Sequence, residues 1–253
     1  MGNDGDDAQD VPPGAGAPHL QLDLEPAPAP FSALPRNAYD LIMADPPWPT
    51  KMRSAKGEKK SFARHYGAMS WDEIAALPVG ALAAKDAVLF LWATSPHLLY
   101  GGDPERHYTD ADAARSKVGA IMAAWGFRYV GIGTWLKLTS SGRPAFATGY
   151  RLRSCCEFWL LGIRGAPCTS RAARNFFAGR ARQHSRKPDE AFEWCEYYLA
   201  GARRLELFSR QSRPGWDTWG YEAGKFDPAV SISAASFEGA KTDSATAAAG
   251  AAA

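Results

Sequence analysis

Residues Tyr39 to Trp48 read YDLIMADPPW, a short apolar run followed by an acid, two prolines and an aromatic residue. Apolar runs of about four to eight residues bounded by turn residues are typical of strands buried on both faces of a sheet. Similar runs occur at Ala87 to Ala93, Phe127 to Trp135, Glu157 to Ile163 and Arg204 to Phe208. Helical patterns alternate with them at Trp71 to Leu77, Ala111 to Trp125 and Pro188 to Ala200. This alternation predicts an α/β fold whose mostly parallel sheet carries helices on both faces.

The composition is that of a packed globular protein: of 253 residues, 46% are hydrophobic and 22% are charged. Residues 1–30 are acidic and rich in Pro and Ala, and residues 229–253 are of low complexity, so we expect one folded domain at 31–228 between flexible ends. No apolar run reaches the roughly 18 residues of a membrane span, and no secretory signal is visible. We therefore expect a cytoplasmic protein that does not bind membranes.

The cysteines are at positions 155, 156, 168 and 195. Their spacing is not that of a zinc site, so we expect reduced thiols and no bound metal. If Cys155 and Cys156 lie in a strand, their side chains should point to opposite faces.

Between Arg36 and Val230 there are 28 basic and 19 acidic residues, a net charge of about +9 that favours a nucleic-acid partner. Six basic residues lie between Lys51 and Arg64, and seven lie between Arg164 and Lys187 with no acid among them. Such stretches are often solvated loops, but two of them predict contacts with phosphates.

In open α/β sheets ligands bind at the carboxyl ends of the strands, and the first strand ends in Asp45-Pro46-Pro47-Trp48. The prolines stiffen this turn and provide no N–H donor. The Asp45 carboxylate and the Pro46 carbonyl are suited to accept both hydrogens of an amino group, and Trp48 offers a face on which a base can stack. These hydrogen bonds would raise the nucleophilicity of the exocyclic nitrogen of adenine, held in line with an activated methyl group. The simpler alternative is a Pro-rich turn capped by an Asp.

The series of motifs resembles the DPPW-type adenine-N(6) methyltransferases. This family includes the catalytic subunit of the eukaryotic mRNA adenosine methyltransferase and DNA methyltransferases of bacteria and phages. The resemblance extends from Tyr39 to Gly220. Beyond MADPPW, it rests on HYGAMSWDEI (His65 to Ile74), AVLFLWAT (Ala87 to Thr94), WGFRYV with TWLK (Trp125 to Lys137), CEFWLLGIRG (Cys156 to Gly165), HSRKPDE (His184 to Glu190) and LELFSR (Leu205 to Arg210). It implies a Rossmann-like fold with S-adenosylmethionine as the methyl donor.

The resemblance also implies roles for individual residues. The catalytic residues that bind the target adenine would be Asp45, Pro46, Pro47 and Trp48. The cofactor-binding residues would be Asp45, Lys187, Phe208, Arg210 and Ser212. The substrate-binding residues would be Tyr66 and Glu157, and we add Lys51, Lys56, Lys59 and Lys60 of the first basic stretch for phosphate contacts.

Several of these residues have an ordinary structural alternative. Tyr66 could pack beneath its loop, Glu157 could pair with Arg151 or Arg153, and Lys187 could be a capping charge. The chain also departs from the family. Ser212 and Arg213 replace a His-Asn pair of the eukaryotic member, and the stretch from Pro30 to Asn37 lacks a counterpart of its upstream acidic ligand.

The compact chain resembles the bacterial and phage members more than the RNA enzyme, so DNA is the favoured substrate, and a homodimer or a heterodimer is compatible with the resemblance. RNA methylation is the first alternative. A catalytically silent nucleic-acid-binding subunit is the second, and the intact Asp45 argues against it. Methylation of cytosine or of a protein amide would call for Ser or Asn at position 45 and Tyr at position 48.

Overall fold

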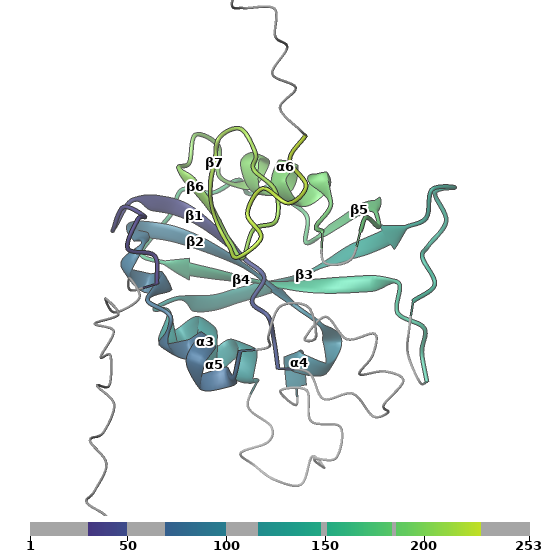
Figure 1. The fold of residues 1–253 in the computed structure, drawn as a ribbon, viewed down its shortest axis with the longest axis horizontal. Coiled ribbons are helices and arrows are strands. Elements are labelled where there is room, and N and C mark those ends of the chain that lie inside the picture. Colours follow the sequence, from purple (N-terminus) through teal and green to yellow (C-terminus); the bar gives the residue numbers. More distant parts are fainter. Residues whose placement is uncertain (1–29, 50–68, 100–115, 148–150, 184–185, 229–253) are drawn as a thin grey trace, which may run out of the picture.

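The structure is a computed structural model that describes residues 30–49, 69–99, 116–147, 151–183 and 186–228. Its seven strands form one sheet in the order β5-β3-β4-β2-β1-β6-β7 (Figure 1). The strands are β1 (Tyr39–Ala44), β2 (Ala83–Ala93), β3 (Arg128–Leu138), β4 (Cys156–Arg164), β5 (Phe176–Arg180), β6 (Arg204–Leu207) and β7 (Trp216–Trp219). The helices are α3 (Trp71–Ala76), α4 (Ser95–Leu99), α5 (Lys117–Ala124) and α6 (Asp189–Tyr198), with a 3-10 turn at Val79–Ala81.

The sheet is mostly parallel, which confirms the expected architecture. Strand β1 runs parallel to both of its neighbours, β2 and β6. The pairs β6–β7 and β3–β5 are also parallel, whereas β4 is antiparallel to β2 and to β3. Because only β4 is reversed among the described strands, its first residues lie at the edge where the other strands end.

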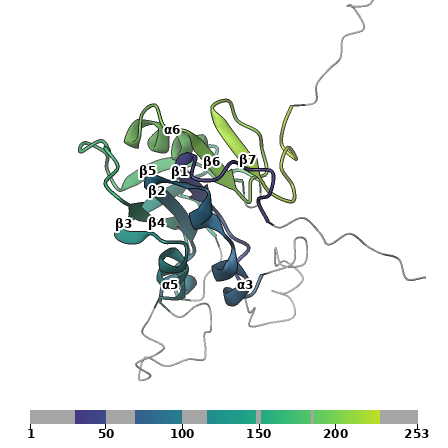
Figure 2. The same ribbon diagram turned by 90° about the vertical axis from the view of Figure 1, so that its left-hand side faces the viewer.

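Side chains alternate between the two faces of the sheet and form two apolar cores. One core contains Ile42 and Leu89 and packs under α3 and α5, and the other contains Met43 and Phe90 and packs under α6. Figure 2 shows α6 on one side of the sheet and α3 with α5 on the other. The expected placement of helices on both faces is therefore confirmed, as is the Rossmann-like architecture.

Local sequence signals explain where the helices begin and end. Ser70 and Glu73 form a capping box at the start of α3, in which each side chain hydrogen-bonds the other residue's backbone N–H. The chain leaves α5 at Gly126, whose φ of 82° lies in the left-handed region that glycine adopts without strain. Helix α6 begins directly after Pro188, as expected from the sequence.

The remaining expectations concern the cysteines and the ends of the chain. The sulfur atoms of Cys155 and Cys156 lie 3.7 Å apart, and the condition for opposite faces is not met, because β4 begins only at Cys156. All four cysteines are free thiols.

Residues 1–29 and 229–253 lie outside the described part, and the domain boundaries stay predictions. No helix within the described ranges is long and apolar enough to cross a membrane.

Candidate active site

Alternation along the strands brings four charged side chains to the same face of the sheet. Met43 of β1 and Trp159 of β4 pack in the core under α6, and Asp45 and Glu157 lie two residues from them. Lys137 lies two residues beyond Trp135 of the same core. Since a strand has a period of two, these side chains share the α6 face. Lys187, just before α6, completes the group.

These four residues form a continuous chain of ion pairs. Lys187 Nζ lies 3.0 Å from Asp45 Oδ2 and 2.9 Å from Glu157 Oε2. Glu157 Oε1 in turn lies 2.5 Å from Lys137 Nζ. The Lys187 ammonium also lies over the ring of Trp92, 4.6 Å from its centroid, a cation–π contact that fixes the lysine above the sheet. The structure therefore places Glu157 against two lysines, instead of the Arg151 or Arg153 partner considered from the sequence.

The network gives its two carboxylates different proton affinities. Burial raises the pKa of Glu157, but the charges of Lys187 and Lys137 outweigh burial and lower that pKa to about 2. Asp45 shares Lys187 with Glu157, and burial together with the Glu157 charge raises the pKa of Asp45 although Lys187 opposes it. The pKa of Lys187 is raised by both carboxylates against the effect of burial. Glu157 is thus a fixed anion, and Asp45 is the carboxylate that takes a proton more readily.

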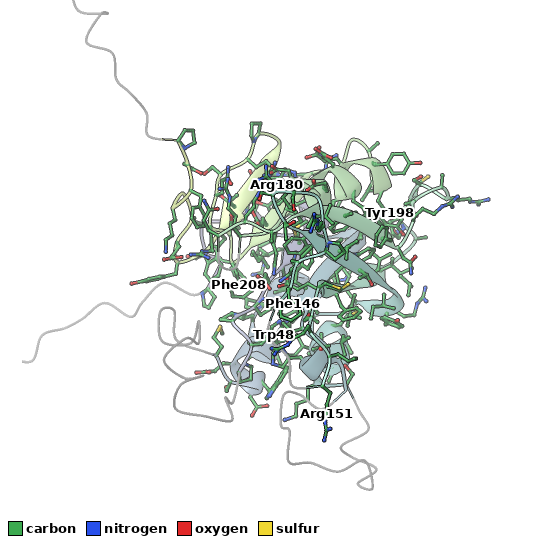
Figure 3. The ribbon with its side chains drawn as sticks, turned by 90° about the vertical axis from the view of Figure 1, so that its right-hand side faces the viewer. Trp48, Phe146, Arg151, Arg180, Tyr198 and Phe208 are labelled. Atoms are coloured by element: carbon green, nitrogen blue, oxygen red, sulfur yellow. The ribbon has the colours of Figure 1, made fainter. Side chains whose placement is uncertain are left out.

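The rest of the DPPW turn faces the opposite core. The Trp48 side chain is only 3% exposed, and its Nε1 donates to the Trp92 carbonyl at 3.1 Å. Its ring packs 5.4 Å from that of Trp71 and 5.9 Å from that of His97, toward the lower helices in Figure 3. In this arrangement Trp48 is part of the wall beneath the site and does not present the open face that stacking of a base requires.

The proline carbonyls are partly occupied by the turn itself. The Pro46 oxygen accepts the Trp48 N–H at 2.8 Å, and the Pro47 oxygen accepts the Met69 N–H at 3.1 Å. A carbonyl oxygen has two lone pairs, so the Pro46 carbonyl retains one acceptor position. Both expected acceptors are therefore present, but the Pro46 carbonyl has only one acceptor position left for an amino group.

A solvent-open pocket adjoins Asp45 and Lys187, and its empty space of about 380 Å³ includes open solvent. It is lined by Asp45, Arg186, Lys187, Phe192, Glu206, Phe208, Arg210, Gln211 and Arg213. Three of the expected cofactor-binding side chains besides Asp45 thus meet here, namely Lys187, Phe208 and Arg210. Ser212 does not line the pocket: its side chain is exposed and its backbone N–H donates to Asp227 at 2.6 Å.

The pocket contains a carboxyl group that the sequence analysis did not single out. Glu206 lies on β6 and accepts a hydrogen bond from Ser209 Oγ at 2.7 Å. Burial raises the pKa of Glu206 to about 7, although this hydrogen bond and Arg213 act in the other direction. Phe208 follows on the rim with a φ of 63°, a left-handed backbone that costs a non-glycine residue about 1–3 kcal/mol and clusters at functional sites.

The first basic stretch, residues 51–64, lies outside the described residues, and the second is described except for residues 184 and 185. Tyr66, Lys51, Lys56, Lys59 and Lys60 lie outside the described residues. In the second stretch Arg164 has a structural role, because its guanidinium donates to the carbonyls of Gly80 at 2.6 Å, Trp125 at 3.2 Å and Gly126 at 3.3 Å. Arg182 pairs with Asp189, and Lys187 belongs to the site. These hydrogen bonds give Arg164 a structural role, and phosphate contacts by the second stretch stay a prediction.

Within the described ranges no cluster of three or more His, Cys, Asp or Glu residues is arranged to hold a metal ion.

Comparison with known proteins places this site in a family. The sequence profile of MT-A70 matches residues 39–222, which include every described residue of the ion-pair network and of the pocket. The chain belongs to the MT-A70 family. It is therefore a member of a family of adenine-N6 methyltransferases, which generally use S-adenosylmethionine.

Relatives of the chain include an RNA methyltransferase, a type II methyltransferase and an adenine-specific methyltransferase. The chain is 30% identical over 193 residues to the N6-methyladenosine RNA methyltransferase MTA1 of Cryphonectria parasitica, covering 74% of this chain and 52% of that protein. It is 29% identical over 211 residues to the type II methyltransferase M.MunI of a Mycoplasma species, covering 76% of this chain and 81% of that protein. It is 28% identical over 205 residues to the N(6)-adenine-specific methyltransferase METTL4 of Mus musculus, covering 74% of this chain and 38% of that protein.

Proposed function

We propose that this protein transfers a methyl group from S-adenosylmethionine to the exocyclic N6 of adenine in DNA. The observation that carries the proposal is the Asp45 carboxylate, which stands at the carboxyl end of β1 beside the pocket and is held 3.0 Å from Lys187. The intact acid also argues against a catalytically silent subunit.

The pocket has the chemistry that S-adenosylmethionine requires. Lys187 and the arginines supply cations for a carboxylate, and Glu206 supplies an anion beside the ammonium and sulfonium charges or the ribose hydroxyls. The rings of Phe192 and Phe208 supply apolar surface for a purine. The residues that would hold the cofactor are therefore Lys187, Glu206, Phe208 and Arg210.

The cofactor supplies an electrophilic methyl group when it is bound. The protein's part is to hold the amino nitrogen in line with that group and to receive the proton released as the new C–N bond forms. Among the described side chains, Lys187 contacts Oδ2 of Asp45 and none contacts Oδ1, so Oδ1 is the atom we assign to the amino group. The raised pKa of Asp45 suits it to take up this proton.

Lys187 and Glu157 keep this carboxylate in place. The Lys187 ammonium compensates the Asp45 charge before proton transfer, and the Glu157 anion compensates the ammonium afterwards. Because Lys137 also pairs with Glu157, the four groups sum to zero before the proton is transferred and to one positive charge once Asp45 holds it.

The share of each relative that the alignment covers favours DNA over RNA as the substrate. The alignment covers 81% of the Mycoplasma type II methyltransferase but 52% of the fungal RNA methyltransferase. The larger matched share of the bacterial methyltransferase supports the choice of DNA.

The test is methyl transfer from radiolabelled S-adenosylmethionine to DNA and RNA of the same sequences, followed by nucleoside analysis. N6-methyladenine in DNA is the expected product. Label found in RNA alone would overturn the choice of substrate, and label in neither, with no cofactor binding by calorimetry, would overturn the proposed activity.

A further inference from the structure

An arm of the chain connects the end of β3 to the start of β4 at the edge of the sheet where the site lies, and its described residues are 139–147 and 151–155. It extends from the right-hand end of the sheet in Figure 1. Backbone hydrogen bonds close a turn at its base, where the Thr139 N–H donates to the Arg143 carbonyl at 2.8 Å. Farther along, the Ala145 N–H donates to the Lys137 carbonyl at 2.7 Å, and the Ala147 N–H donates to the Ser154 carbonyl at 3.0 Å. The residue before Phe146 is therefore bonded to the end of β3, and the residue after it is bonded to the returning part of the arm.

The arm exposes two apolar side chains. The Phe146 side chain is 79% exposed and that of Leu152 is 85% exposed. The Arg153 guanidinium lies over the Phe146 ring, 5.2 Å from its centroid. With so much of the ring in solvent, the face opposite Arg153 is open for stacking.

The charge of the arm has one sign. Arg143, Arg151 and Arg153 are exposed, and residues 139–155 contain no Asp or Glu. None of the three forms an ion pair with a carboxylate of the described residues. Figure 3 shows Arg151 extending beyond the body of the molecule, below Phe146.

The arm is physically coupled to the ion-pair network. Lys137, whose ammonium contacts Glu157 at 2.5 Å, receives the Ala145 hydrogen bond on its own carbonyl. Phe146 is thus one residue from a direct backbone contact with a member of the network.

We propose that this arm is a nucleic-acid-binding surface on which Phe146 stacks against an unpaired base next to the target adenine, while Arg151 and Arg153 contact the phosphates beside it. The proposal rests on the proposed function and names the form of its substrate. Stacking requires an exposed base face, which a strand offers where it is single or where a neighbouring base has been extruded. Aromatic side chains with flanking cations are the usual means of binding such strands.

A second copy of this chain fits the arm less well than a polyanion does. In a two-fold dimer the same patch meets itself, so the three arginines would face three arginines with no acid between them. The patch is therefore complementary to phosphates and repels its own copy.

The experiment measures fluorescence anisotropy of a labelled adenine-containing single-stranded DNA, and of the matching RNA, with the full chain. Phe146→Ala should raise the dissociation constant about 5- to 100-fold, and Phe146→Trp should restore it. The double variant Arg151→Ala/Arg153→Ala should flatten the slope of log affinity against log salt by about 1.4. Tyr129→Ala and Arg128→Ala, exposed at the opposite end of β3, are matched controls and should bind within about twofold of wild type.

The outcomes separate this inference from the proposed function. If the wild-type protein binds and methylates but the arm variants bind as tightly as wild type with the same salt slope, the inference is wrong and the function stands. If binding depends on the arm but no adenine is methylated, the function is wrong and the surface stands. A dimer that Phe146→Ala converts to a monomer in sedimentation velocity, with unchanged nucleic-acid affinity, would show instead that the arm is a protein interface.

Discussion

Replacing Lys187 by methionine should destabilise the protein mainly through Asp45. The Lys187 side chain is 10% exposed and its ammonium lies within 3.0 Å of both carboxylates. Glu157 keeps Lys137 as a partner at 2.5 Å, whereas no other described cation contacts Asp45. Breaking a buried ion pair costs about 3–5 kcal/mol. Because the Asp45 side chain is 29% exposed, water offsets part of this cost, and we expect a loss of about 2–3 kcal/mol at pH 7.

The loss should depend on pH with a defined sign. Asp45 has a raised pKa in the folded protein, and removing the lysine raises it further. A carboxyl whose folded pKa exceeds its unfolded pKa loses stability as pH rises from the unfolded pKa to the folded pKa. Relative to wild type, the variant should therefore become less stable between a pH near the ordinary aspartate pKa of about 4 and pH 7, by at most about 1.4 kcal/mol per pH unit.

Urea unfolding followed by tryptophan fluorescence at the two pH values measures this difference. Lys187→Arg retains the charge and should lose less, and Lys85→Met, at an exposed position on β2, should be close to neutral. A Lys187→Met variant as stable as wild type at pH 7, or equally destabilised at both pH values, would refute the assignment of the penalty to Asp45.

Three further changes test other parts of the account. The pKa of Glu206 is raised to about 7, so affinity for the cationic cofactor should rise between about pH 6 and pH 8 as this group ionises. Calorimetry on Glu206→Gln should show a weaker dependence of cofactor affinity on pH. The same pH dependence in both proteins would contradict the role of Glu206. Gly133→Ala places a Cβ 1.9 Å from Trp159 and should lower the free energy of unfolding by at least about 1–3 kcal/mol. In the control Gly131→Ala the new Cβ meets nothing within 4 Å, and stability should change by about 0.5 kcal/mol or less. Equal melting temperatures of the two variants would be inconsistent with this packing. Arg164→Met should lower the free energy of unfolding by about 1.5–3 kcal/mol through its lost hydrogen bonds, without changing nucleic-acid affinity. A flatter slope of log affinity against log salt in this variant would show that Arg164 contacts a phosphate.

The central strands and the long helices were predictable because their signals are local. Strand β1 occupies Tyr39–Ala44 as predicted, since a strand buried on both faces reads as a continuous apolar run. The edge strands β5 and β7 were not predicted, because their partly exposed residues, FFAGR and WDTW, do not form such a run. Their strand conformation comes from pairing with β3 and β6, which is a tertiary effect.

The site was predictable in its acids and less so in its geometry. The DPPW turn led to Asp45, but the burial of Trp48 depends on α3 and α4 packing around it, which the sequence alone does not show. Glu206 had a usable signal, since a single acid between Leu205 and Leu207 points to the opposite face of β6 from both. The role of Arg164 required the fold, because its carbonyl partners lie about 40 to 80 residues away in the sequence.

The most direct test of the central claim is single-turnover methyl transfer by Asp45→Ala, with cofactor binding measured on the same preparation. We propose that Asp45 accepts a hydrogen bond from the amino group of adenine. The Asp45→Ala variant keeps the residues proposed to hold the cofactor, Lys187, Glu206, Phe208 and Arg210. We predict loss of transfer to DNA with cofactor binding still measurable. Transfer at a rate near that of wild type would contradict the account.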